Sequence, residues 1–388
     1  LNLFLKLLII FIFYKKQFIK KIQKTNKFIA HTDREIEVHK TDFQFIVFFC
    51  DIIYNIIIMA SIIAAPVQFH DRCHLPVKIY YEDTDCVGIV YHSNYLKYFE
   101  RGRELLLGQD QLVDLFDTSG RSFVVVNVKI AYKKAARHGD TLEVRTVPTI
   151  ESSYRLEFDQ SVWRKNITTK QLEESNNEPW TLIVQGTVQM VCVGKDMKIC
   201  TLPDMITVDM RQIFGDLLNP KKKTMKKKLP PPKKKLLAND GWSEPKDVKI
   251  EVYYEDTDFT TVVYYANYMK FMERARSQLF GFKSLEIMKN KYNASFAVYN
   301  GELDFKSGGT IGDVLIVKTK FKIESDYRIA FEQDIYRRCN GMDERTEMNL
   351  NNDQNDVLLV KGKLVLCCIN DVGNLVKLPE IVLELTKS

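Results

Sequence analysis

Residues 81–103 read YEDTDCVGIVYHSNYLKYFERGR, and residues 254–276 read YEDTDFTTVVYYANYMKFMERAR. An Asp-rich segment followed by an aromatic-rich segment therefore occurs twice in the chain. The two copies keep one register, because Asp85 and Asp258 lie 173 positions apart and matching residues farther along keep the same spacing. A register held over this length indicates one fold encoded twice.

A strand, a loop and a helix are predicted around the first copy of this motif. Val77, Ile79 and Tyr81 alternate with residues of the other face, which predicts a strand that buries these three side chains together. After the Asp-rich loop, residues 93–116 predict one long helix. Its apolar side chains cover much of the helix circumference, so we expect other structure to enclose it.

The remainder of each copy predicts antiparallel strands. In the first copy they cover residues 122–134, 140–150, 153–164 and 180–193. These stretches are rich in Val, Ile, Thr, Tyr and Phe and are separated by turn signals. One early helix followed by a strand meander is an α+β pattern, in which a sheet would wrap the helix. The polar inserts before the last strand of each copy, residues 166–179 and 340–356, predict loops.

The chain divides into four predicted regions. They are a doubtful N-terminal extension (1–58), a first domain (70–210), a Lys/Pro-rich linker (211–246) and a second domain (247–388). The extension is dominated by Ile, Phe, Lys and Asn, and the first Met in the sequence is Met59. Three interpretations stay open for it: translated upstream sequence, a membrane anchor or an organelle-targeting leader.

The positive charge of the chain is concentrated outside the two repeats. Residues 220–240 carry nine Lys and one Asp, which is +8, and residues 1–58 carry +4. Subtracting both from the net charge of +6 leaves about −6 for the rest of the chain. We therefore expect no nucleic-acid binding by the repeats. Three consecutive prolines among the lysines predict an extended tether, with a nuclear-import signal or an anionic-membrane patch as the alternatives.

The eight cysteines form no CxxC pair and no regular spacing, which argues against a zinc site. They indicate reduced, mostly buried thiols in a reducing compartment. We therefore expect a chain without metal or cofactor, located in the cytoplasm, with association to an organelle or a membrane as the open alternative.

Both copies place a tyrosine, an aspartate and a second ring at one spacing. These residues are Tyr81, Asp85 and His92, then Tyr254, Asp258 and Tyr265. A carboxylate just ahead of a helix has two interpretations. It caps the helix through its oxygens, as Asp83 or Asp85 could, or it stays ionised beside a helix N-terminus whose N–H groups receive a developing oxyanion.

The motif YYEDTDCVGIVYHSNYLKYFERGR resembles that of the 4-hydroxybenzoyl-CoA thioesterase-like hot-dog family, in particular its Tol-Pal-associated acyl-CoA thioesterase branch. The similarity covers nearly all of both repeats. It implies tandem hot-dog domains, a double hot dog, in which each antiparallel sheet is wrapped around a long helix. In that family two such units pair, and the thioester site lies at the seam between them.

The resemblance assigns roles to the motif residues. The family's catalytic aspartate falls on Asp85, and its supporting tyrosine and histidine fall on Tyr81 and His92. Gly88 and Tyr254 are assigned to substrate binding on the same basis. Asp85 would act either as nucleophile or as general base, while N–H groups around His92 would polarise the thioester carbonyl.

The second copy departs from the motif at two positions. Thr261 replaces Gly88, and a β-branched residue would distort the loop if a positive φ is required there. Tyr265 replaces His92, which resembles the 4-hydroxybenzoyl-CoA thioesterases themselves. Asp258 and Tyr265 are therefore predicted to form a second catalytic pair.

The function implied is hydrolysis of an acyl-CoA substrate, with the two halves paired within one chain. Pairing of each half with another chain, giving a homo-oligomer, is the alternative arrangement. A non-catalytic acyl-CoA-binding or scaffold protein and a 3-hydroxyacyl thioester dehydratase are the alternative functions. Lys133 and Lys134 are candidates for binding the phosphates of coenzyme A, whereas Glu100 with Arg103 is predicted to form a helix salt bridge at the surface or at an interface. The acyl group stays open.

Overall fold

The computed structural model describes residues 72–165, 180–204, 206, 241–338 and 356–385 of this 388-residue chain. All of them belong to one compact unit, residues 69–388. The predicted N-terminal extension, almost all of the linker and almost all of the two polar inserts lie outside the described residues.

The first half contains five strands, two helices and a short 3-10 turn. In chain order these are β1 (His74–Lys78), η1 (Tyr81–Asp83), α4 (Asn94–Leu107), α5 (Gln109–Ser119), β2 (Ser122–Tyr132), β3 (Thr141–Ile150), β4 (Arg155–Lys165) and β5 (Trp180–Val193). The strand predictions for this half are confirmed to within a few residues.

The second half repeats this order and adds a short C-terminal helix. Its elements are β6 (Lys246–Glu251), η3 (Tyr254–Asp256), α8 (Asn267–Phe280), α9 (Phe282–Tyr292), β7 (Ser295–Phe305), β8 (Val314–Ser325), β9 (Arg328–Arg337), β10 (Val357–Ile369) and α10 (Glu380–Leu385).

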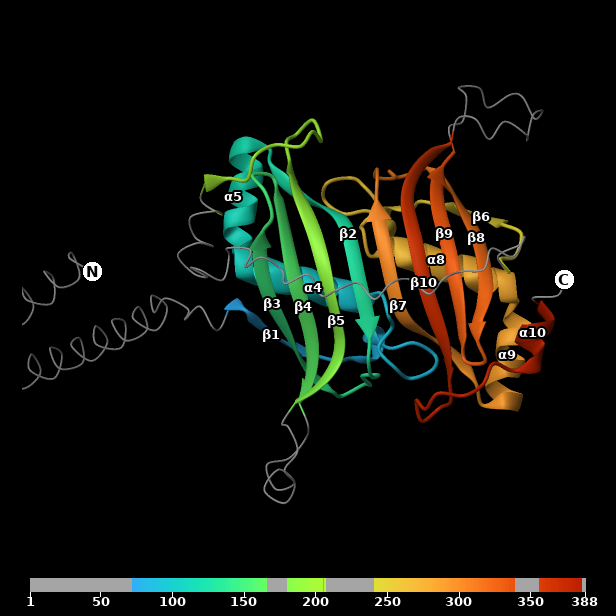
Figure 1. Cartoon of the computed structure of the whole chain (residues 1–388). Helices are drawn as coiled ribbons and strands as arrows, with labels where there is room; N and C mark the ends of the chain where they lie inside the picture. Colours follow the sequence, from blue (N-terminus) through green and yellow to red (C-terminus); the bar gives the residue numbers. More distant parts are fainter. Residues whose placement is uncertain (1–71, 166–179, 205, 207–240, 339–355, 386–388) are drawn as a thin grey trace, which may run out of the picture. The chain divides into compact units, whose positions relative to one another are not determined.

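The described strands form a sheet in the order β1-β3-β4-β5-β2-β7-β10-β9-β8-β6. Every neighbouring pair is antiparallel. Figure 1 shows α4 crossing the strands of its own half on one face of the sheet and α8 doing the same in the second half. An antiparallel sheet with helices packed along one face confirms the expected α+β, hot-dog fold, and the repeated element order is consistent with two such units in one chain.

Strands β2 and β7 join the two halves. Their pairing runs from Asn127 opposite Asp304 to Ala131 opposite Asn300. The side chain of Asn127 donates to Asp304 Oδ1 over 2.7 Å. Outside this short register, the halves meet through the helices and the Asp-rich loops described below.

The prediction of one long helix over residues 93–116 is wrong, because the helix breaks at Gly108. This residue has a φ of +86°, which only glycine adopts without strain, and its N–H closes α4 on the carbonyl of Glu104. Gly281 makes the same break in the second half with a φ of +76°. The enclosed helix is therefore α4 alone, since α5 buries only Leu115.

The core lies between α4 and its sheet, where Leu96, Tyr98 and Phe99 are at most 1% exposed. Gly186 on β5 makes room for this helix: an added Cβ there would lie 2.4 Å from a neighbouring strand carbonyl and 3.1 Å from Phe99.

Tyr81 departs from the predicted strand face. It is 81% exposed, because the chain leaves β1 and turns through η1.

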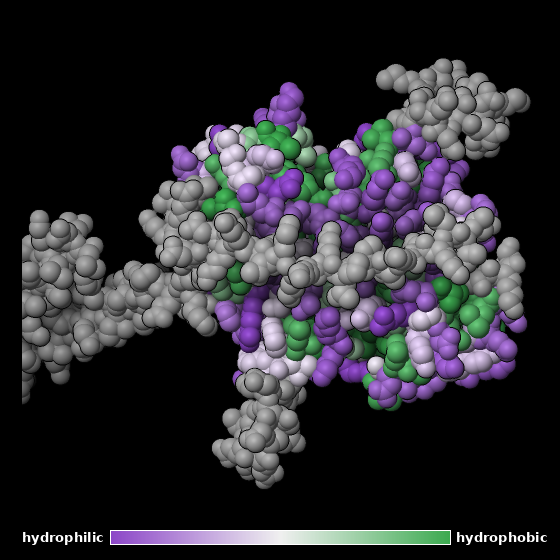
Figure 2. All heavy atoms as spheres, viewed as in Figure 1, coloured by the Kyte–Doolittle hydropathy of each residue, from purple (hydrophilic) through white to green (hydrophobic). Residues whose placement is uncertain are grey.

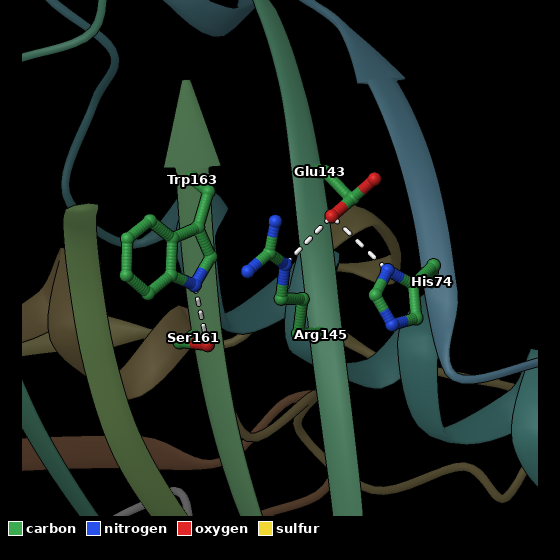
Figure 3. Close-up of polar contacts among 5 residues, drawn as sticks. All are labelled: His74, Glu143, Arg145, Ser161 and Trp163. Carbon is green, nitrogen blue, oxygen red and sulfur yellow. Dashed lines mark hydrogen bonds and ion pairs between the residues drawn. The ribbon is translucent and has the colours of Figure 1, made fainter. Parts of the chain in front are cut away.

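The opposite face of the sheet carries polar side chains, and hydrophilic residues cover much of it in the second half (Figure 2). Figure 3 shows how such contacts join β1, β3 and β4. Glu143 Oε1 lies 3.1 Å from His74 Nδ1 and 2.7 Å from Arg145 Nε. The Arg145 guanidinium lies 4.8 Å from the Trp163 ring centroid, and Trp163 donates to Ser161.

Candidate active site

The first carboxylate of the loop, Asp83, has a structural role. It accepts the Tyr80 N–H over 2.9 Å and the Tyr98 hydroxyl over 2.7 Å, while the side chain of Asn94 donates to its carbonyl. These bonds fix the loop to the first turns of α4. The prediction that Asp83 or Asp85 caps the helix is wrong, since the residue at the N-cap is Ser93 and no side chain caps this end.

The second carboxylate, Asp85, is held by the backbone of its own loop. Its Oδ1 accepts the Val87 N–H over 2.8 Å, and the Gly88 N–H donates to the Asp85 carbonyl over 2.9 Å. Gly88 has a φ of +81°, so the loop does require the left-handed region at this position. Burial raises the pKa of the Asp85 carboxyl above its ordinary value, and nearby Glu273 acts in the same direction, against the backbone N–H groups that lower it.

Asp85 and His92 line one cavity of about 580 Å³, and the second half supplies much of its wall. Glu273, Arg276 and Ser277 face it from α8. Arg276 is 3% exposed and bonds to the buried Gln333 side chain. Charged groups from both halves therefore converge at the seam, as expected for a site built from two units.

His92 contacts the second half through its ring. Burial lowers the pKa of its imidazole to about 3, and the positive charge of Arg276 acts in the same direction. The ring bonds to the backbone of Met269 on α8, and among the described residues its Nε2 has no partner. The hydroxyl of Tyr132 donates to the His92 carbonyl over 2.9 Å and so fixes its backbone. His92 is therefore a neutral side chain with an unused acceptor.

The remaining predicted residues of the first site lie elsewhere. Tyr81 stacks on His138 with ring centroids 4.1 Å apart, and neither Tyr81 nor Gly88 lines the cavity. Tyr254 is 85% exposed at the matching position of the second half. The 3-10 turn that follows each first strand points both tyrosines to solvent. Lys133 and Lys134 do line the cavity, so their predicted place beside the substrate fits the geometry.

The second Asp-rich loop keeps its shape despite the threonine. Thr261 adopts a φ of +68°, and its N–H donates to the Asp258 carbonyl over 2.9 Å, as Gly88 does in the first loop. The distortion expected from this substitution is therefore absent, and strain at Thr261 replaces it. The Thr260 N–H donates to Asp258 Oδ1, as the Val87 N–H does to Asp85 Oδ1 in the first loop. The difference is that the Thr260 hydroxyl donates to Asp258 Oδ1 as well.

We call the contact between the second Asp-rich loop and α4 the second seam. It brings Asp258 towards residues of α4. Tyr265 donates its hydroxyl to the Leu96 carbonyl and accepts a bond from Arg103 over 3.2 Å. Burial raises the pKa of the Glu100 carboxyl to about 7, and the charge of Asp258 contributes to the shift. Of the two predicted locations for Glu100 and Arg103, the surface and an interface, the structure shows the interface, where Arg103 is 2% exposed and bonds to Tyr265.

Sequence reasoning missed Glu273, Ser277 and Tyr132 as residues of the first cavity. Glu273 accepts a hydrogen bond from the Ser277 hydroxyl, one turn farther along α8. The available signal was the repeat itself, because Glu273 and Glu100 occupy the same helix position in two copies of a motif expected to meet at a seam.

Over the described ranges, no group of three or more His, Cys, Asp and Glu side chains could hold a metal ion. The six described cysteines are free, and Cys192, Cys367 and Cys368 are buried. Within the same ranges, each helix is too short or too polar to cross a membrane. The cytoplasmic location stays a prediction.

Comparison with known proteins identifies the family. A model described as the Thioesterase-like superfamily matches residues 80–210. The chain is 32% identical over 139 residues to the acyl-CoA thioester hydrolase YbgC of Escherichia coli, covering 35% of this chain and 94% of that protein. It is also 32% identical over 120 residues to the acyl-CoA thioesterase YbgC of Haemophilus influenzae, covering 30% of this chain and 78% of that protein.

Among solved structures, an acyl-ACP thioesterase from Bacteroides thetaiotaomicron has a TM-score of 0.50 and 11% identity. The superposition covers 77% of this chain and 100% of the Bacteroides chain, so the similarity of fold extends beyond either half. The sequence matches, the hot-dog arrangement of each half and the aspartate-lined cavity agree, and the chain belongs to the Thioesterase-like superfamily.

Proposed function

We propose that this chain is an acyl-CoA thioesterase that hydrolyses its substrate to a carboxylic acid and free coenzyme A. The observation that carries the proposal is the placement of Asp85 in a cavity walled by both halves, beside His92 and the polar face of α8. The activities for which the Escherichia coli and Haemophilus influenzae relatives are named support the same reaction.

Asp85 is the proposed reacting carboxylate. It attacks the thioester carbonyl carbon, or it removes a proton from the water that does so. When Asp85 attacks, the carbon–sulfur bond breaks and leaves an acyl-aspartate anhydride, which water then hydrolyses to the carboxylic acid and free Asp85. When Asp85 acts as base, water attacks the carbonyl carbon and the carbon–sulfur bond breaks directly. In both cases the sulfur leaves as coenzyme A thiolate and is protonated, in the second case by the proton that Asp85 took from the water. The raised pKa of the Asp85 carboxyl favours either role, because a more basic carboxylate is a better nucleophile and a better base.

The start of α4 is the proposed oxyanion site. No side chain caps this end of the helix. The N–H groups of Asn94 and Leu96 bond to the carbonyls of Tyr91 and Ser93, so the N–H of Tyr95 is the proposed donor. His92 and Tyr95 line the cavity at this end. Aiming such N–H groups at a developing oxyanion is worth about 3 to 4 kcal/mol per donor in enzymes that use them.

His92 is the proposed orienting residue for the attacking water. Its low pKa keeps the ring neutral at physiological pH, so Nε2 accepts a hydrogen bond rather than donating one. Arg276 supplies positive charge on the other side of the cavity.

The intramolecular double hot dog is part of the proposal, with domains at residues 70–210 and 247–388. The β2–β7 pairing and the cross-seam bonds of His92 and Tyr265 support pairing within one chain. Assignment to the Tol-Pal-associated branch rests on the motif alone. Gel filtration beside sedimentation tests whether one chain or two form the unit.

The test is steady-state thiol release from several acyl-CoAs by the wild type, Asp85→Asn, Asp258→Asn and the double variant. Loss of the reacting carboxylate at the first site is expected to lower kcat by about 100-fold or more. The double variant should lose what activity remains. Binding of an acyl-CoA without thiol release by the wild type would refute the proposal and support the scaffold alternative, while hydration of crotonyl-CoA would support a dehydratase.

A further inference from the structure

The cavity beside Asp85 continues along α8 into the second half. Glu273, Arg276, Ser277 and Phe280 line it in succession on one side of this helix. Seven residues separate Glu273 from Phe280, which is about 10 Å along the helix axis. The cavity is therefore longer than the reacting carbonyl requires.

The chemistry of the wall changes along this path. The end near Asp85 is charged and polar, whereas the far end is lined by apolar side chains of α8, α9 and β7. These are Phe280, Leu285, Met288, Phe296 and Val298. Phe280 and Phe296 stack with ring centroids 4.9 Å apart, and Met288 is 1% exposed. We call this apolar end the α9 arm.

The register of the sheet explains why the arm exists. In the described part of the chain, β2 pairs with β7 only over residues 300–304, whereas β10 pairs with β7 as far as Ser295. The first residues of β7 therefore lie beyond the end of its pairing with β2. The arm opens beside them, and Lys289 on α9 ties it to the Asp85 loop by donating to the Cys86 carbonyl over 2.9 Å.

We propose that the Asp85 site takes unbranched aliphatic acyl-CoAs of medium to long chain, and that the α9 arm of the second half binds the alkyl chain. This inference rests on the proposed function. An arm lined by these aromatic and aliphatic side chains suits methylene groups, each of which contributes about fourfold in binding when fully buried. Short acyl groups would leave the arm unused.

The experiment measures kcat/KM for acetyl-, octanoyl-, dodecanoyl- and benzoyl-CoA in the Asp258→Asn background, so that the Asp85 site is observed alone. We expect kcat/KM to rise about 100-fold from acetyl-CoA to octanoyl-CoA in this parent. Leu285→Trp fills the arm and should lower the values for octanoyl- and dodecanoyl-CoA by about tenfold or more, with acetyl-CoA hydrolysis close to that of the parent.

Leu112→Trp is the matched control. Leu112 occupies the same position on α5, 173 residues earlier, is half-buried like Leu285, and does not line this cavity. It should leave the chain-length profile unchanged. Leu285→Phe is a milder second variant for the case in which Leu285→Trp does not fold. It should shift the chain-length profile in the same direction by a smaller factor.

The outcomes separate this inference from the proposed function. Thiol release from acetyl- or benzoyl-CoA as efficient as from octanoyl-CoA would overturn the inference and leave the thioesterase function standing. An equal loss of kcat/KM for all four substrates in Leu285→Phe would also overturn the inference. So would a change of the chain-length profile in Leu112→Trp that matches the change in Leu285→Trp. Absence of thiol release from every substrate in the wild type would refute the function itself.

Discussion

Replacing Glu100 by glutamine should stabilise the first half at alkaline pH. Burial at the second seam raises the pKa of this carboxyl from 4.5 to about 7. A group whose pKa is raised by folding favours the folded state fully below 4.5 and loses that contribution as pH rises towards 7. At pH 8 the ionised Glu100 therefore costs about 3 kcal/mol relative to a neutral group.

Glutamine removes the charge and keeps an oxygen that can accept the bond from Tyr264, so the variant tests ionisation rather than contact. The assay is urea unfolding at pH 5 and pH 8, followed by the fluorescence of Trp163 and Trp180 in the first half. Between these two pH values the wild type should lose about 2.5 kcal/mol more stability than Glu100→Gln.

The control for this measurement is Glu286→Gln, which removes an exposed carboxylate of α9 and should leave the pH dependence as in the wild type. A stability change in Glu100→Gln that is the same at pH 5 and pH 8 would refute the reasoning, because it would show that Glu100 does not titrate in this range. Destabilisation at pH 8 alone would refute it more strongly.

Three further predictions concern the two loops. Thr260→Val removes the hydroxyl that binds Asp258, and in an Asp85→Asn background we expect thiol release to rise about tenfold. Unchanged thiol release would contradict an inhibitory role of this hydroxyl. Thr261→Gly relieves a φ of +68° and should raise the free energy of unfolding by about 1 kcal/mol in urea titrations, whereas Thr261→Ala should not. The pH profile of kcat/KM should show no histidine ionisation between pH 5 and 8, since the pKa of His92 is about 3; a step near 6.5 that His92→Asn abolishes would contradict this.

The sequence predicted the fold well where the signal was local. A local richness in Val, Ile and Thr predicted a strand at residues 180–193, and the structure has β5 from Trp180 to Val193. The helix break at Gly108 was missed because the apolar pattern continues past it, so only a backbone requirement, a positive φ, distinguishes this glycine. The exposure of Tyr81 was missed for a related reason, since alternation does not reveal where a strand turns away.

The site was predicted only as far as a single copy of the motif could show it. Asp85 and His92 were identified as neighbours in sequence, and both line the cavity. Glu273 lies 188 positions from Asp85, so no spacing within one domain relates them. Its contribution depends on how two halves meet, which is set by the short β2–β7 register and by the side chains between the helices.

Pairing two copies in one chain also allows the two seams to differ. The differences favour catalysis at the first seam, which holds Asp85. At the first seam, Ser277 lies one turn along α8 from Glu273. At the second seam, Glu104 occupies the matching position, one turn along α4 from Glu100. A tetrahedral intermediate carries negative charge, so an additional carboxylate near it raises the barrier, and the hydroxyl bond from Thr260 makes the Asp258 carboxylate less reactive. We therefore expect turnover to depend mainly on Asp85, with the second half contributing the wall against which that carboxylate works.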